Sequence, residues 1–201
     1  SGLTQYGKGV FPWERRAEAV NELANFKPEL DWEQLREKMK VHGVRNATLM
    51  AVAPVESSSV VLNSTNGIEM PMELISVKES KAGSFVQVVP EYRRLKNRYE
   101  LLWDQKSPEG YLKIVAVLQR WMDQTISLNT SYNPEFYPEH QLPMSDLLRH
   151  MLLAYKWGIK TGYYFNLLDG QGEVDVDKMM ESQQTIQPET PDEEECESCV
   201  I

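Results

Sequence analysis

Cysteine is almost absent from the 201-residue sequence: Cys196 and Cys199 are the only two. A secreted scaffold held together by several disulfides is therefore excluded, and so is a zinc site built from four cysteines. Histidine is nearly as scarce. His42, His140 and His150 show no spacing typical of metal ligands, either with one another or with the cysteines. We therefore expect no metal or other cofactor in this chain.

Long apolar runs are missing as well. No segment approaches the roughly 20 apolar residues of a membrane helix, and the start lacks the basic-then-apolar pattern of a signal peptide. We expect a cytoplasmic protein that does not contact the membrane. The chain begins at Ser1 instead of Met, as expected of a processed or excised polypeptide or of a cloning remnant. Five Trp and nine Tyr supply core material for one globular domain.

Basic charge is scarce in one part of the chain only. Residues 169–201 contain eleven acidic residues and one basic residue, a net charge of -10, whereas the whole chain carries -9. The preceding 168 residues are nearly neutral, with 20 basic and 19 acidic residues. A nearly neutral body has no strong field to attract a polyanion. We therefore expect no nucleic-acid partner.

The sequence divides into three parts. Residues 1–30 are expected to form a connector with one helix, residues 31–168 an α/β segment, and residues 169–201 a flexible acidic tail. Periodicity predicts helices at 14–26, 32–42, 109–124 and 145–157, and strands at 47–53, 74–78, 85–89, 125–128 and 160–165. Asp31 and Ser145 are expected N-caps. Strand, helix and strand in that order predict parallel pairing with a crossover helix.

The two cysteines form a Cys-x-x-Cys pair in the acidic tail. Cys196 and Cys199 are close enough to form a disulfide, and a mobile tail lets them visit other sites, which suits a redox carrier. Glu195 and Glu197 should raise the pKa of both thiols because they disfavour the thiolate. The pair therefore suits exchange with a dedicated partner. The alternative is two incidental exposed thiols.

Two consecutive tyrosines, Tyr163 and Tyr164, form the second notable feature. In a regular strand, adjacent side chains point to opposite faces, so one ring would lie in the core and the other at the surface. If Gly162 bends the backbone instead, the rings can stack and exchange an electron and a proton. Both readings stay open from the residues alone.

A Ser-rich turn, PVESSS at residues 54–59, is the third feature, and it is expected to open a short helix. Hydroxyl groups and backbone N–H groups at the start of a helix can hold an anion such as phosphate. Glu56 would oppose this if its carboxylate faced the anion. The alternative is a simple helix cap.

These features and several others resemble one family when taken together and in order. The matching motifs are DWE at 31–33, HGVRNATL at 42–49, PVESSS at 54–59, NGIE at 66–69, VPEY at 89–92, YELLW at 99–103, LAYKWGIKTGYYFN at 153–166 and CESC at 196–199. They resemble the large subunit of class I ribonucleotide reductases over essentially the whole chain. The resemblance implies an α/β fold: the C-terminal part of a ten-stranded α/β barrel, followed by a disordered acidic C-terminal tail. It also implies reduction of ribonucleoside diphosphates to deoxyribonucleotides through a thiyl radical.

The resemblance also implies roles for the tyrosines and cysteines. Tyr163 and Tyr164 match the stacked tyrosine pair that relays a radical towards the active-site cysteine. Cys196 and Cys199 match the tail pair that re-reduces the active-site disulfide and is itself reduced by thioredoxin or glutaredoxin. A mobile tail fits this task because thiol exchange needs contact in two places at different times.

Other parts of the motif set correspond to binding surfaces. Glu56, Ser57 and Ser58 match the loop that holds the diphosphate of the ribonucleoside diphosphate substrate, with Val55 and Ser59 beside them. The helix expected at 145–157 resembles the surface that docks the C-terminal peptide of the small subunit. That partner is expected to carry a diiron or related metal-radical centre.

The main departure from the family is an absence. Since both cysteines lie in the tail, the radical-bearing cysteine and the active-site dithiol have no counterpart here. We expect a domain cut from a longer polypeptide or half of a naturally split large subunit, active only with an N-terminal half and the small subunit. A part of a barrel would expose unpaired strand edges, which also favours a partner chain.

Smaller departures concern two segments. Met70-Pro71-Met72 lacks a basic residue that some relatives place there, and the spacing of Cys196 and Cys199 is tighter than in some bacterial relatives. Two other functions stay open. One is a non-catalytic module that binds the small subunit and presents a redox-active tail, and the other is an α/β domain without chemistry.

Overall fold

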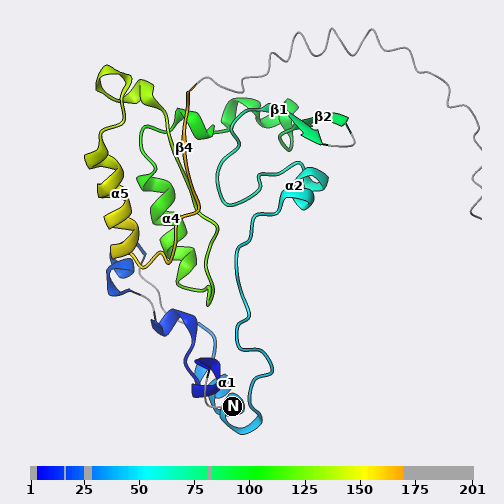
Figure 1. Cartoon of the computed structure of the whole chain (residues 1–201). Coiled ribbons are helices and arrows are strands. Elements are labelled where there is room, and N and C mark those ends of the chain that lie inside the picture. The colour runs from blue at the N-terminus through cyan, green and yellow to red at the C-terminus, as the bar shows by residue number, and fades with distance from the viewer. Residues whose placement is uncertain (1–3, 16, 25–28, 81–82, 170–201) are drawn as a thin grey trace, which may run out of the picture. The chain divides into compact units, whose positions relative to one another are not determined.

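The computed structural model describes residues 4–15, 17–24, 29–80 and 83–169 (Figure 1). The helices are η1 (Tyr6–Lys8), η2 (Pro12–Arg15), η3 (Glu18–Glu22), α1 (Trp32–His42), α2 (Glu56–Leu62), α3 (Tyr92–Leu95), η4 (Lys96–Arg98), η5 (Leu102–Asp104), α4 (Glu109–Gln119), η6 (Pro134–Phe136), η7 (Pro138–His140) and α5 (Met144–Lys156). The strands are β1 (Ile75–Ser80), β2 (Gly83–Val88), β3 (Asn129–Tyr132) and β4 (Tyr164–Leu167). The acidic tail with its two cysteines lies outside the described residues, so its flexibility stays a prediction.

Helix α1 confirms the sequence prediction. The Asp31 carboxylate accepts a hydrogen bond from the Gln34 N–H at 2.9 Å, which caps the start of the helix. Gly43, at φ 74°, ends it and donates its N–H to the Met39 carbonyl at 2.8 Å. Such an N-cap stabilises a helix by about 1 kcal/mol. These signals are local, which is why the sequence predicted both ends.

The helix predicted at 14–26 is wrong. Two short 3-10 helices, η2 and η3, stand in its place, with Ala17 extended between them (φ -64°, ψ 134°). The Glu14 carboxylate accepts the Phe11 N–H at 2.8 Å and pairs with the Arg36 guanidinium at 2.6 Å. The break itself lies at Ala17, whose extended backbone separates η2 from η3. The end of the predicted helix lies outside the described residues.

The hydrophobic core forms around one face of α4. Leu112, Val115 and Ala116 recur at helical spacing and are at most 1% exposed. The other buried members of the cluster are Val20, Tyr111, Ile126, Leu128, Trp157 and Ile159. Helix α4 ends at Gln119 instead of residue 124, and the Gln119 side-chain amide donates to the Gln124 carbonyl at 2.8 Å beyond that end.

Strands β3 and β4 pair in parallel, and α5 connects them, as predicted (Figure 1). Both strands begin about four residues later than expected: Asn129 pairs with Tyr164 at the start of the ladder. The apolar side chains at 125–128 are buried in the core, but the pairing between the two strands begins only after them. The cap was also misassigned, because α5 begins at Met144 with Pro143 as its N-cap and Ser145 in the first turn.

The strand predicted at 47–53 is not formed as a whole. The structure has one isolated parallel bridge there, between Val52 and Ile126. The Asp123 carboxylate accepts the N–H groups of Leu49 and Met50 at 2.5 and 3.0 Å. These donors are therefore not available to a strand ladder. The side chains of residues 45–51 are exposed, which leaves this segment without a covering layer in the described part of the chain.

Strands β1 and β2 form an antiparallel hairpin with Ile75 opposite Val88, which confirms the predicted strand pair. Residues 92–104 form three short helices, α3, η4 and η5. The described residues thus contain two separate two-stranded sheets. This is an α/β architecture.

Gly158 allows a test of the connection between α5 and β4. Its φ is +81°, and a Cβ there would lie 2.9 Å from the Cβ of Ala17. A left-handed backbone costs an alanine roughly 1–2 kcal/mol, and the contact adds to that. We expect Gly158→Ala to lower the free energy of unfolding by at least this amount, measured by denaturant titration. Gly110→Ala, in α4 and with open space around it, should instead raise it by about 0.5–1 kcal/mol. Equal effects would contradict the prediction.

Candidate functional site

The two tyrosines lie at the start of β4 with their rings in contact. The ring centroids of Tyr163 and Tyr164 are 4.2 Å apart at an interplanar angle of 54°, and the Tyr164 hydroxyl donates to the Tyr163 hydroxyl at 3.5 Å. Tyr163 precedes the ladder, and its N–H donates to the Leu128 carbonyl at 2.7 Å. The strand alternation therefore does not apply to this pair. Rings expected on opposite faces lie side by side.

Both rings are about half exposed, at 50% for Tyr163 and 56% for Tyr164. The interpretation with one core ring and one surface ring is therefore wrong. The rings meet as the other interpretation expected, but they are tilted and not parallel. The bend does not come from Gly162 in a left-handed conformation, since Gly158 is the glycine of this segment with a positive φ.

The contact between the two rings also changes the acidity of Tyr163. The hydrogen bond with Tyr164 is the main cause that raises the pKa of Tyr163, and the negative charge of Glu56 adds to the effect. The phenol is therefore neutral at physiological pH. Loss of an electron from a neutral phenol is accompanied by loss of its proton, so the pair is suited to moving a hydrogen atom.

The Ser-rich turn forms the first part of α2, as predicted. Glu56, Ser57 and Ser58 are exposed at its start, with Val55 as the N-cap. Ser59 is different: it is fully buried, and its hydroxyl lies 2.7 Å from both the Glu56 carbonyl and the Asn66 Oδ1. Three side chains of the turn therefore face outward, and the fourth holds the turn together.

A half-buried acid, Glu69, is hydrogen-bonded to the start of β3. The Asn129 Nδ2 donates to the Glu69 Oε1 at 2.8 Å. Burial, followed by the negative charge of Glu69, raises the pKa of Tyr111. Gly67 makes room for this carboxylate, because a Cβ there would overlap the Glu69 Oε2. In the sequence, Glu69 stands out only as the last residue of the NGIE motif at 66–69.

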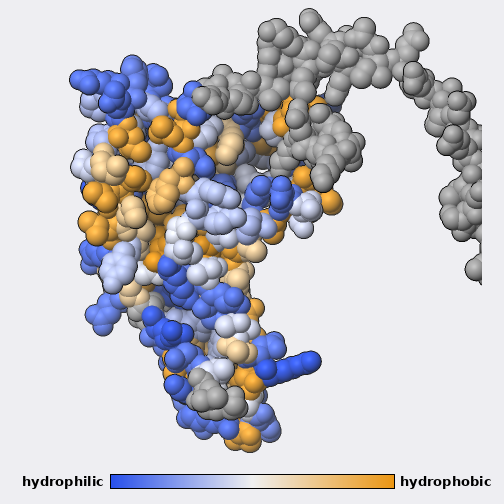
Figure 2. Space-filling view, in the orientation of Figure 1, coloured by the Kyte–Doolittle hydropathy of each residue, from blue (hydrophilic) through white to orange (hydrophobic). Residues whose placement is uncertain are grey.

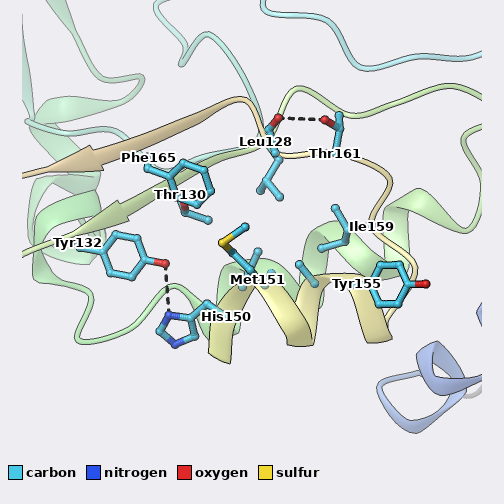
Figure 3. A pocket seen from close by; sticks show the side chains of 12 residues that line it. Leu128, Thr130, Tyr132, His150, Met151, Tyr155, Ile159, Thr161 and Phe165 are labelled. Carbon is cyan, nitrogen blue, oxygen red and sulfur yellow. Dashed lines mark hydrogen bonds between the residues drawn. The ribbon is translucent and has the colours of Figure 1, made fainter. Parts of the chain in front are cut away.

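A small apolar cavity of about 130 Å³ lies between α5 and the β3–β4 pair (Figure 3). Met151 and Phe165 line it, and Tyr132 points towards His150 at its polar end. The Tyr132 hydroxyl and the His150 Nδ1 are 3.3 Å apart. Burial, followed by the charge of Arg149, lowers the pKa of His150. The imidazole is therefore neutral at physiological pH, and the cavity carries no charge from it.

The outer face of α5 is apolar, as the docking prediction requires (Figure 2). Met144, Leu148 and Leu152 are between 52% and 68% exposed. Lone exposed apolar residues are normal, but three at helical spacing on one helix form a patch of the kind that marks an interaction site.

The described part of the chain contains no group of three or more His, Cys, Asp or Glu side chains that could hold a metal ion. No helix in the same residues is long and apolar enough to cross a membrane. Cys196 and Cys199 lie outside the described residues, so their redox role stays a prediction.

A parallel β3–α5–β4 unit with a contacting tyrosine pair at the start of its second strand belongs to the α/β class of proteins. Comparison with protein families gives a match to the family described as "Ribonucleotide reductase, barrel domain" over residues 3–100 and 92–165. The chain therefore belongs to the ribonucleotide reductase barrel-domain family, in agreement with the resemblance found in its motifs.

Individual relatives agree with this assignment. The ribonucleoside-diphosphate reductase subunit alpha of Buchnera aphidicola subsp. Baizongia pistaciae is 49% identical over 85% of this chain and 22% of its own length. Subunit alpha of reductase 1 from Escherichia coli K12 is 45% identical over 87% of this chain and 23% of its length. The subunit alpha of Enterobacteria phage T4 is 39% identical over 98% of this chain and 25% of its length. The chain thus spans about a quarter of the length of these relatives.

Proposed function

We propose that this chain supplies the C-terminal part of the catalytic barrel in the large subunit of a ribonucleoside-diphosphate reductase. The complete barrel would have ten strands, with β3 and β4 among them and the remainder contributed by an N-terminal half. The observation that carries the proposal is the contacting tyrosine pair on a chain of this family. The assembled enzyme would act in the cytoplasm.

The tyrosine pair would relay the radical. A phenoxyl radical on one tyrosine accepts a hydrogen atom, one electron and one proton, from the hydroxyl of the other. The first ring returns to a phenol and the second becomes the phenoxyl. The hydroxyl distance of 3.5 Å supports this role, since a hydrogen atom can move only over a short distance. The radical would originate at a diiron or related metal centre in the small subunit.

Substrate binding would fall to the exposed start of α2. Glu56, Ser57 and Ser58 would contact the diphosphate of a ribonucleoside diphosphate through side-chain hydroxyls and backbone N–H groups. Their exposure supports the proposal, because the three side chains are not used in packing. Glu56 would contribute its N–H and keep its carboxylate away from the phosphate.

The tail would restore the enzyme after each turnover. Cys196 and Cys199 as a dithiol would give two electrons and two protons to the active-site disulfide and become a disulfide themselves. Thioredoxin or glutaredoxin would then reduce that disulfide. The small subunit would dock on the apolar outer face of α5, where Leu148 and Leu152 are 52% and 68% exposed.

The test is deoxynucleotide formation from CDP. This chain is mixed with the N-terminal part of the large subunit, the small subunit and a thioredoxin system, and each component is omitted in turn. We expect product only when all are present. A stable complex without turnover would contradict the catalytic proposal and leave the non-catalytic docking module. Absence of any complex would leave an α/β domain without chemistry.

A further inference from the structure

The side chain of Gln87 is a buried amide that joins two parts of the molecule far apart in sequence. Gln87 lies in β2 and is 8% exposed, whereas Val86 beside it is 40% exposed. Its Nε2 donates hydrogen bonds to the Ser59 carbonyl and to the Ser64 carbonyl, each at 3.1 Å. Both amide hydrogens therefore hold the segment that contains α2.

The Ser59 carbonyl lies in the last turn of α2, and the Ser64 carbonyl lies two residues beyond the end of the helix. The last carbonyls of a helix have no partner within the helix and need donors from elsewhere. Asn63 turns the chain with φ 51°, and the Ser64 N–H donates back to the Ser59 carbonyl at 2.9 Å. Gln87 adds a donor from the hairpin and fixes this turn to β2.

The turn is connected in the same way to the start of α2. The Val55 N–H donates to the Asn66 carbonyl at 2.8 Å, so the residue before Glu56 is held by the segment that follows the helix. The Ser59 hydroxyl, which contacts both the Glu56 carbonyl and the Asn66 side chain, closes the loop. A short series of hydrogen bonds thus runs from Gln87 to Glu56.

We infer that Gln87 is a positioning residue for substrate binding: it holds α2 so that Glu56, Ser57 and Ser58 keep the geometry that fits a diphosphate. This inference rests on the proposed function of those three residues. Gln87 does not touch the substrate itself. A loop that is free to move loses affinity because binding must then order it. Since the diphosphate is common to all ribonucleoside diphosphates, the loss is the same whatever the base.

The test measures equilibrium binding of ADP, CDP, GDP and UDP to the assembled reductase, together with KM and kcat for each. Gln87→Met keeps the length of the side chain and removes both donors. We expect Kd and KM to rise about tenfold for all four, as for the loss of one or two buried hydrogen bonds. The kcat should stay within about twofold. Unfolding would instead lower the number of sites and leave Kd unchanged.

Two further variants complete the experiment. Val86→Thr, on the same strand and the opposite face, should leave Kd unaltered. Gln87→Asn keeps the amide but is shorter, so it should also raise Kd, and it replaces Gln87→Met if that variant does not assemble. An unchanged Kd in a folded Gln87 variant overturns the inference, and so does a change for one base only. A wild-type assembly that binds none of the four diphosphates overturns the proposed function and this inference with it.

Discussion

Deoxynucleotide formation should fall by at least about 100-fold when Tyr164 is replaced by phenylalanine in the assembled reductase, the usual size of the loss when a positioned proton-transferring group is removed. Phenylalanine keeps the ring that contacts Tyr163 but lacks the hydroxyl that donates to it at 3.5 Å. Without that hydroxyl there is no hydrogen atom to move. Tyr163→Phe should cause an equal loss, because the radical must pass through both tyrosines in turn. The measurement is turnover of CDP with all partner proteins present.

Two observations separate a broken relay from a damaged fold. CDP binding should be unchanged in both variants, since neither ring is buried and neither hydroxyl contacts the core. Tyr92→Phe, a control on α3 at a distance along the chain from the pair, should retain full activity. Turnover close to that of the wild type in Tyr164→Phe would show that the pair does not carry the radical.

The parts of this fold that the sequence predicted are those whose structure depends on residues close together in the chain. The ends of α1 were predicted because Asp31 and Gly43 act within one turn of the helix they bound. The order β3, α5, β4 was predictable because a strand pattern, a helix pattern and a second strand pattern follow one another along the sequence. The positions of the strands were not, since the apolar side chains at Ile126 and Leu128 mark burial against α4 and not the ladder that begins at Asn129.

Tertiary contacts explain the other errors. Residues 14–26 have helical periodicity, but the chain is extended at Ala17, and Glu14 pairs with Arg36, 22 residues away. The segment before Val52 has the composition of a strand, but the Asp123 carboxylate accepts hydrogen bonds from the N–H groups of Leu49 and Met50. Neither partner can be identified from the sequence, because each is brought in by folding of the rest of the chain.

The candidate site was predictable only in part for the same reason. Adjacent tyrosines and a run of serines are visible as motifs, and the structure gives the rings their contact and the turn its exposed start. Gln87 has no such signal, because a glutamine in a strand is usually an ordinary surface residue. Its role becomes visible only when β2 is placed against the end of α2.

The tail cysteines give the last prediction. In Cys196→Ser or Cys199→Ser, thioredoxin-driven formation of deoxynucleotide should stop after about one turnover per site, because serine cannot form the disulfide that carries two electrons. Dithiothreitol, which is small enough to reach an active-site disulfide directly, should restore continued turnover. The measurement is product formed per enzyme with each reductant.

Ser198, which lies between the two cysteines in sequence, provides the matched control. Ser198→Ala should turn over normally with thioredoxin, since it changes the tail without removing a thiol. If the cysteine variants also turned over normally with thioredoxin, the pair would be two incidental thiols. If dithiothreitol failed to restore them, the loss would lie in the barrel and not in the delivery of electrons. The combination of loss with thioredoxin and recovery with dithiothreitol therefore assigns the tail to re-reduction alone, and separates that step from the radical transfer at Tyr163 and Tyr164.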